Sequence, residues 1–214
     1  MPEVVINNGP EGRIEARYQK AATATAPVAL VMHPHPRFGG TMNNKVVYNI
    51  FHALARSGFA VLRFNFRGVG KSQGTFDNGQ GELADAAAAL DWLQTYHPSA
   101  SHTWVSGFSF GAWIAMQLLM RRPEINALIA VAPPANIYDF AFLAPCPSSG
   151  LIIQGTGDEV VPEPDVNKLA NRLKAQRGIG VEYKTIAGAD HFFEGKLDEM
   201  AAMIERYADT TVKA

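Results

Sequence analysis

Short apolar runs alternate along this chain with longer segments of helical periodicity. The apolar runs are three to five residues long, and turn residues follow them. Such runs are typical of strands that are buried on both faces of a parallel sheet. The expected strands of this kind are Val28–Met32, Ala60–Phe64, Ala127–Val131 and Leu151–Ile153, and two further strands are expected at Thr103–Val105 and Val181–Ile186.

Between these runs, apolar residues recur every three or four positions, which predicts amphipathic helices. The stripes are Val46, Val47, Ile50, Phe51 and Leu54; Leu83, Ala86, Ala87, Leu90 and Leu93; Val166, Leu169, Ala170 and Leu173; and Phe193, Leu197, Met200, Ala201, Ile204 and Tyr207. A further helix, Ala112–Met120, is almost wholly apolar. The alternation predicts an α/β fold with a mostly parallel, doubly wound sheet and helices on both faces. We expect one domain over residues 1–214.

Composition and charge narrow the choice of partners. Hydrophobic residues at 47% and charged residues at 18% favour a folded globular chain. A net charge of -1 gives no electrostatic reason to expect nucleic acid or an anionic membrane as a partner. The first residues lack the pattern of a signal peptide, and no apolar run reaches the ~20 residues that span a bilayer. The lone Cys146 lies between two prolines and is interpreted as structural. We expect a cytoplasmic protein.

A Gly-x-Ser-x-Gly pentapeptide, Gly107–Gly111, joins the strand that ends at Val105 to the apolar helix that begins at Ala112. On such a turn the serine is held in a strained conformation that exposes its hydroxyl, while the glycines let strand and helix approach. In parallel sheets, ligands bind beyond the carboxyl ends of the strands. Ser109 is therefore the candidate nucleophile.

A serine nucleophile needs a base, usually a histidine that a carboxylate orients. Asp158 follows the strand at Leu151–Ile153, and His191 follows the last strand. Asp190 adjoins His191, but a sequence neighbour is poorly placed to meet the ring nitrogen that faces away from the serine. Asp158 is therefore favoured as the acid, and Glu159 is the second choice. The order serine, acid, histidine is that of α/β-hydrolases.

The chain resembles the α/β-hydrolases over nearly its full length. It is most similar to the small, lidless bacterial serine hydrolases near dienelactone hydrolases, which carry the segment that reads here His33-Pro34-His35-Pro36-Arg37-Phe38-Gly39-Gly40. The segment Asn65–Ser72 also matches. Dienelactone hydrolases use a cysteine nucleophile, whereas Ser109 stands here. The resemblance implies an α/β-hydrolase fold without a large cap and serine esterase chemistry.

Two backbone N–H groups are needed to stabilise the oxyanion. In this fold one comes from the residue after the nucleophile, Phe110, and the other from the loop after the strand that ends at Met32. Pro34 and Pro36 have no N–H, so His35 is the expected donor. We expect His33 to fix the loop. Two alternate histidines without a nearby carboxylate or cysteine cluster make a poor zinc site, so neither a metal nor another cofactor is expected.

The segment around Gly68 invites two other interpretations. A phosphate-binding loop would need glycine at position 65, where Asn65 stands, and a dinucleotide fingerprint would need glycine at position 73, where Gln73 stands. The segment therefore matches neither motif. Arg67 could bind an anionic substrate group or could brace the loop, and the structural role is slightly favoured.

Only Ala135–Ser149 separates two of the expected strands, which is too short for a lid of several helices. The site should be open and shallow, with best turnover on short acyl chains. Aromatic residues near the expected site could supply an apolar wall: Phe38, Phe76, Tyr138, Phe140, Phe142 and Phe192.

The sequence therefore predicts a serine hydrolase, and specifically a carboxylesterase whose partner is a small-molecule ester. The same three residues could instead serve a thioesterase, a lactonase or a peptidase. A non-catalytic binding module on a hydrolase fold is the alternative from another class.

Overall fold

The computed structural model describes residues 3–212, and they form one eight-stranded sheet. The strands are β1 (Glu3–Gly9), β2 (Gly12–Gln19), β3 (Val28–Met32), β4 (Ala60–Phe64), β5 (Thr103–Phe108), β6 (Ala127–Val131), β7 (Ser149–Gly155) and β8 (Val181–Ile186). Their order across the sheet is β1-β2-β4-β3-β5-β6-β7-β8. The six strands from β3 to β8 run parallel to one another, while β1 and β2 are antiparallel to their neighbours. The predicted mostly parallel sheet is confirmed.

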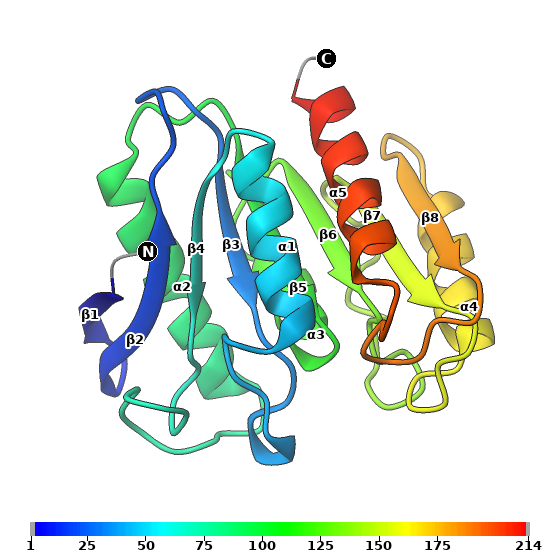
Figure 1. Ribbon diagram of the computed structural model, residues 1–214, viewed down its shortest axis with the longest axis horizontal. Coiled ribbons are helices and arrows are strands. Elements are labelled where there is room, and N and C mark those ends of the chain that lie inside the picture. Colours follow the sequence, from blue (N-terminus) through cyan, green and yellow to red (C-terminus); the bar gives the residue numbers. More distant parts are fainter. Residues whose placement is uncertain (1–2, 213–214) are drawn as a thin grey trace.

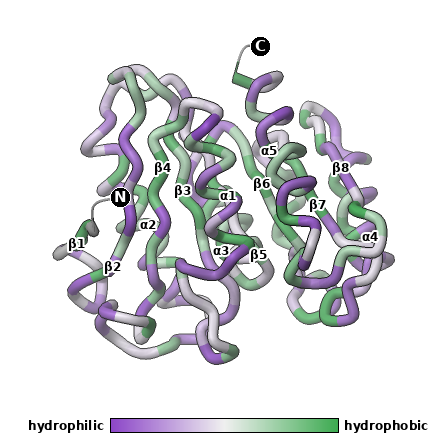
Figure 2. Tube along the Cα trace, viewed as in Figure 1, coloured by the Kyte–Doolittle hydropathy of each residue, from purple (hydrophilic) through white to green (hydrophobic). Residues whose placement is uncertain are grey.

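Helices cover both faces of the sheet, as predicted. They are α1 (Lys45–Arg56), α2 (Gln80–Tyr96), α3 (Phe110–Leu119), α4 (Glu163–Lys174) and α5 (Leu197–Thr211). Helices α1 and α5 pack together on one face, and α2, α3 and α4 lie on the other (Figure 1). Each face buries its own apolar cluster, and the central strands are predominantly hydrophobic (Figure 2).

The register of the parallel strands sets the position of the site. Met32, the last residue of β3, pairs with Gly107 of β5, and Phe108 pairs with Val131, the last residue of β6. The carboxyl ends of these strands therefore lie level with one another. The loops that follow them meet at one edge of the sheet, where ligands bind in open α/β sheets.

The hairpin of β1 and β2 precedes β3, the first strand that the sequence pattern predicts. In β2, Ile14 and Ala16 are buried, and Arg13 is exposed. This alternation of apolar and polar positions is the signal that could have revealed the strand. It differs from the continuous apolar runs of the parallel strands because β2 lies near the edge of the sheet.

Residues 3–212 place no large cap over the carboxyl ends of the strands. The segment between β6 and β7, residues 132–148, forms turns. No helix within residues 3–212 has the length and apolar character that crossing a membrane requires.

Candidate active site

Ser109 lies between β5 and α3 in a strained backbone conformation, with φ 53° and ψ -120°. Positive φ is unfavourable for a residue with a side chain, so the turn is held by its surroundings. A Cβ atom on Gly107 would lie 2.2 Å from the carbonyl carbon of Gly111, and one on Gly111 would lie 2.4 Å from the carbonyl oxygen of Met32. The two glycines therefore permit the close approach of strand and helix that presents Ser109.

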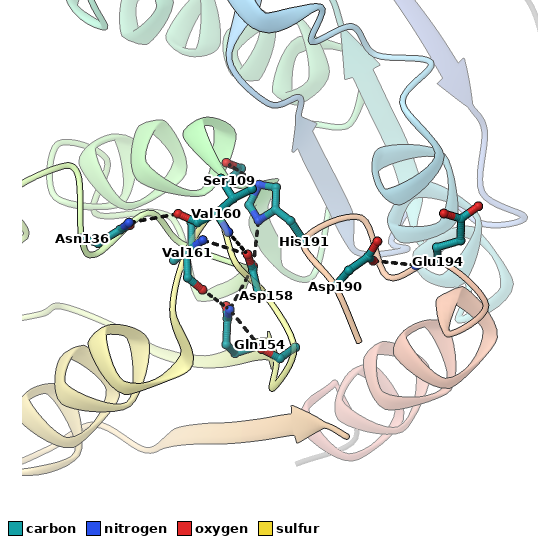
Figure 3. A network of polar contacts seen from close by, with 10 residues as sticks. Ser109, Asn136, Gln154, Asp158, Val160, Val161, Asp190, His191 and Glu194 are labelled. Atoms are coloured by element: carbon teal, nitrogen blue, oxygen red, sulfur yellow. Dashed lines mark hydrogen bonds and ion pairs between the residues drawn. The ribbon is translucent and has the colours of Figure 1, made fainter. Parts of the chain in front are cut away.

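The structure brings Ser109, His191 and Asp158 together from three loops (Figure 3). Nε2 of His191 lies 3.2 Å from Oγ of Ser109, and Nδ1 of His191 lies 2.8 Å from Oδ2 of Asp158. The imidazole thus joins the hydroxyl to the carboxylate through its two nitrogens. Asp158 and His191 are both buried, while Ser109 is partly exposed.

Asp158 is held by four hydrogen bonds. Its Oδ1 accepts from the amides of Val160 and Val161, and its Oδ2 accepts from Nε2 of Gln154 as well as from His191. Burial raises the pKa of Asp158, but the hydrogen bonds from His191 and Val161 outweigh it and bring the pKa below its usual value. The carboxylate is therefore ionised at neutral pH. Sequence reasoning missed Gln154, whose only signal was a polar residue at the end of an apolar strand.

The two rival carboxylates lie elsewhere. Oδ1 of Asp190 accepts a 2.9 Å hydrogen bond from the amide of Glu194, so Asp190 caps its own turn (Figure 3). Glu159 is exposed. Only Asp158 contacts His191 among the described carboxylates.

The amides of His35 and Phe110 lie on neighbouring segments at the site. The His35 and Phe110 rings pack with their centroids 4.9 Å apart. Within residues 3–212, neither amide donates a hydrogen bond to another residue. The carbonyl of His35 accepts from the amides of Phe38 and Gly40, which closes the loop tightly. Neither N–H group is therefore occupied by another described residue.

His33 holds the loop after β3 in place. Its Nε2 accepts a 3.0 Å hydrogen bond from the amide of Phe66, and its Nδ1 lies 2.7 Å from the carbonyl oxygen of Pro34. Only the neutral tautomer with hydrogen on Nδ1 satisfies both contacts. Burial lowers the pKa of His33 to about 4. The ring is therefore neutral at physiological pH and ties the loop after β3 to the loop after β4.

Arg67 is engaged in a buried ion pair. Its Nε and Nη2 atoms donate to the two carboxylate oxygens of Asp85 on α2, at 3.0 and 2.9 Å. Asp85 also accepts a hydrogen bond from the Arg67 amide. These hydrogen bonds raise the pKa of Arg67 above its ordinary value. The geometry is that of a brace between the loop and the helix.

A cavity of about 520 Å³ opens over Ser109. Three of the six expected aromatic residues line it: Phe38, Tyr138 and Phe192. Phe76 lines an adjoining hollow instead. Phe140 is buried in the core, and Phe142 stacks on it with ring centroids 6.0 Å apart. The expectation that Phe76, Phe140 and Phe142 line this cavity is therefore corrected.

The cavity also has walls that sequence reasoning did not identify. These are Pro134, Ile137 and Val160, which follow β6 and β7, and Asn44, which precedes α1. Ile137 and Val160 are more than half exposed, which is unusual for apolar side chains, and no sequence signal distinguishes them from core residues.

A reactive Cys146 and a metal centre, the two remaining candidates, find no support in the part of the chain that the structure describes. Cys146 is buried, and burial raises the pKa of its thiol, which leaves it unreactive. Among residues 3–212, no group of three or more histidine, cysteine, aspartate or glutamate side chains is arranged to hold a metal ion.

Comparison with known proteins identifies the family. The family model for X-Pro dipeptidyl-peptidase (S15 family) matches residues 15–206. The uncharacterized protein RP471 of Rickettsia prowazekii is 58% identical over 214 residues, which cover 98% of this chain and 90% of that protein. The solved structure of ATU1826 from Agrobacterium tumefaciens, a proposed α/β hydrolase of unknown function, has a TM-score of 0.95 at 57% identity and covers 99% of this chain and 97% of its own.

A third similar protein is XC6422 from Xanthomonas campestris, described as an α/β serine hydrolase without a lid. Its structure has a TM-score of 0.85 at 33% identity and covers 96% of this chain and 92% of its own. The chain therefore belongs to the α/β serine hydrolases, within the family described as X-Pro dipeptidyl-peptidase (S15 family).

Proposed function

We propose that this chain is a carboxylesterase that cleaves small esters of short apolar acids through an acyl-enzyme on Ser109. The observation that carries the proposal is the continuous series of hydrogen-bonding contacts from Ser109 through His191 to Asp158, beside an apolar cavity. The described lining of that cavity contains no aspartate, glutamate, lysine or arginine. A neutral ester fits such a site.

In the first half of the reaction, Oγ of Ser109 attacks the ester carbonyl carbon while Nε2 of His191 takes the hydroxyl proton. Asp158 stabilises the imidazolium through Nδ1. The amides of His35 and Phe110 donate to the oxyanion. The tetrahedral intermediate collapses when His191 passes the proton to the leaving alcohol oxygen and the ester C–O bond breaks.

In the second half, a water molecule loses a proton to Nε2 of His191 and its oxygen attacks the acyl carbon. The bond between the acyl carbon and Oγ of Ser109 breaks as His191 returns the proton to the serine oxygen. The acid leaves and the free enzyme is restored. Every step uses the same nitrogen of His191, which lies 3.2 Å from Ser109.

The segment His33–Gly40 supports the role of His35 in this scheme. It matches the segment of the small lidless hydrolases near dienelactone hydrolases, and it follows β3, where this fold places its second oxyanion donor. The clamp between His33 and Phe66 holds the segment in place. A donor that is fixed before the reaction stabilises developing charge without reorganisation.

Peptide hydrolysis is the first rival, because the family model is named for a dipeptidyl-peptidase. Release of an amino-terminal dipeptide requires a group that binds the substrate's ammonium, and carboxylates are suited to this. The described walls of the cavity supply none, and Glu194 lines an adjoining hollow rather than the cavity itself. This favours an ester over a peptide with a free amino terminus.

The acyl chain is proposed to be short because the cavity is open. Phe38 is 87% exposed and Phe192 is 52% exposed, so these walls have no cover. Each buried methylene contributes about 0.8 kcal/mol, but a chain that extends past these walls stays in water.

A panel of matched substrates tests the proposal. Ethyl butanoate, S-ethyl thiobutanoate, γ-butyrolactone and glycyl-prolyl anilide are supplied to the wild-type enzyme and to Ser109→Ala, which corrects for background. We expect the highest kcat/KM on the ester. A preference for the anilide would establish a peptidase, and a preference for the thioester or the lactone would replace the esterase reading. Absence of turnover on all four would favour the binding module.

A further inference from the structure

Two further hollows adjoin the central cavity, and each shares different walls with it. The aromatic hollow, of about 400 Å³, is lined by His35, Arg37, Phe38, Phe76, Asn78 and Tyr138. The polar hollow, of about 550 Å³, has among its walls Thr41, Asn43, Asn44, Lys45, Phe192 and Glu194. The first meets the cavity at His35, Phe38 and Tyr138, and the second meets it at Gly39, Asn44 and Phe192. The reacting centre therefore has two unlike extensions.

The reaction chemistry assigns the two halves of the ester to these extensions. The leaving oxygen must lie within hydrogen-bond reach of Nε2 of His191, which protonates it. Phe192 follows His191, packs against it with ring centroids 5.3 Å apart, and forms a wall of the polar hollow. His35, the oxyanion donor, belongs to the aromatic hollow instead. The alcohol half thus extends toward the polar hollow and the acid half toward the aromatic side.

The polar hollow offers both donors and an acceptor. Lys45 and Glu194 are exposed, and neither forms an ion pair within residues 3–212. Oδ1 of Asn44 accepts from the amide of Val46 and caps α1, which fixes the side chain. Glu194 lies four residues after Asp190, and its backbone amide donates a hydrogen bond to Oδ1 of Asp190 (Figure 3). The hollow therefore presents a carboxylate from one loop and an ammonium from the start of α1.

We propose that the polar hollow binds an alcohol with several hydroxyl groups, such as glycerol or a sugar, as the leaving group of the ester. The inference rests on the proposed esterase function and adds the class of alcohol. A hydroxyl group both donates and accepts hydrogen bonds. Adjacent hydroxyls can donate to Glu194 and accept from Lys45, whereas a simple alkyl alcohol can do neither beyond its ester oxygen. Hydrogen bonds to charged groups are the stronger ones.

Two dissolved esters of the same acid test this assignment: 1-butanoylglycerol and propyl butanoate. The measured quantity is the ratio of kcat/KM for the glyceryl ester to kcat/KM for the propyl ester. The double variant Lys45→Ala/Glu194→Ala is expected to lower this ratio by roughly tenfold, the effect of losing one or two exposed charge-assisted hydrogen bonds. The matched control is Lys196→Ala/Glu199→Ala, which removes an exposed ion pair outside the hollow and should leave the ratio as in wild type.

The outcomes separate this inference from the function on which it rests. If the wild-type enzyme cleaves both esters and the ratio is the same in the Lys45/Glu194 double variant, the polar hollow does not select the alcohol. If butanoylcholine is preferred over the glyceryl ester and Glu194→Ala removes that preference, the hollow selects a cation and the assignment to a polyol is wrong. If the wild-type enzyme cleaves no ester at all, the esterase function itself fails.

Discussion

The imidazole of His33 accepts, through Nε2, a 3.0 Å hydrogen bond from the backbone amide of Phe66. The two ring centroids lie 4.6 Å apart, and His33 is fully buried. This contact joins the loop that carries His35 to the loop that carries Arg67. It exists only while Nε2 of His33 carries no proton.

Acid should therefore weaken the fold through His33. Burial lowers its folded-state pKa to about 4, below the ordinary 6.5. Between these values the unfolded chain binds a proton that the folded chain does not, so stability falls as pH decreases from 6.5 to 4, by about 3 kcal/mol in total. Urea unfolding of the wild type and His33→Gln at several pH values measures this. The variant should lose that part of the pH dependence, and an identical dependence in both proteins would contradict the account.

Asp158→Asn should lower kcat by about 10³- to 10⁴-fold, because the amide no longer stabilises the imidazolium and favours the wrong tautomer of His191. Asp190→Asn is the matched control, since Asp190 caps the neighbouring turn. Steady-state hydrolysis of p-nitrophenyl butanoate measures both. A larger loss in the Asp190 variant would reverse the choice of acid.

The pair of Arg67 and Asp85 should stabilise the loop without recognising substrate. Both side chains are buried, so Asp85→Asn removes the nearest counter-charge and leaves the guanidinium only its 3.6 Å contact with the exposed Glu11, which should cost roughly 3 kcal/mol of unfolding free energy. The double variant Arg67→Met/Asp85→Leu should recover much of this loss. Urea unfolding measures the free energies. In the double variant, a selective rise of KM for an anionic ester over a neutral one would show instead that Arg67 binds substrate.

Turnover should stop improving as the acyl chain grows past the exposed walls of the cavity. On p-nitrophenyl esters from acetate to dodecanoate, kcat/KM is expected to rise by at most about fourfold per buried methylene and then to level off. The rate should show no jump above the solubility limit of the substrate. A kcat/KM that still climbs at dodecanoate would rule out the short-acyl assignment.

The hydrophobic pattern of the sequence was sufficient to predict the central parallel strands, because a strand that is buried on both faces is restricted to apolar residues. Ala127–Val131 is apolar throughout, and every residue of this strand is buried. The meeting of Ser109, Asp158 and His191 was predictable for a related reason, since residues that follow parallel strands share one edge of the sheet. The hairpin of β1 and β2 was not predicted because polar residues alternate with apolar ones in β2, which is a weaker signal than a continuous apolar run.

The sequence did not predict where the side chains within loops lie. Phe38 and Phe140 are both phenylalanines in connecting segments, yet Phe38 is 87% exposed at the cavity and Phe140 is 3% exposed in the core. No periodicity distinguishes them, because a loop has no repeating face. Arg67 left two roles open for a similar reason: its partner Asp85 lies 18 residues away on α2.

Labelling with a fluorophosphonate probe tests the central claim most directly, because the probe reacts with a serine only when its oxygen is activated as a nucleophile. Peptide mass spectrometry then locates the adduct. We expect one adduct on Ser109 in the wild type, none in Ser109→Ala, and labelling slowed by about 10²-fold or more in His191→Ala. An unlabelled wild type, an adduct on another residue, or undiminished labelling of His191→Ala would contradict that claim.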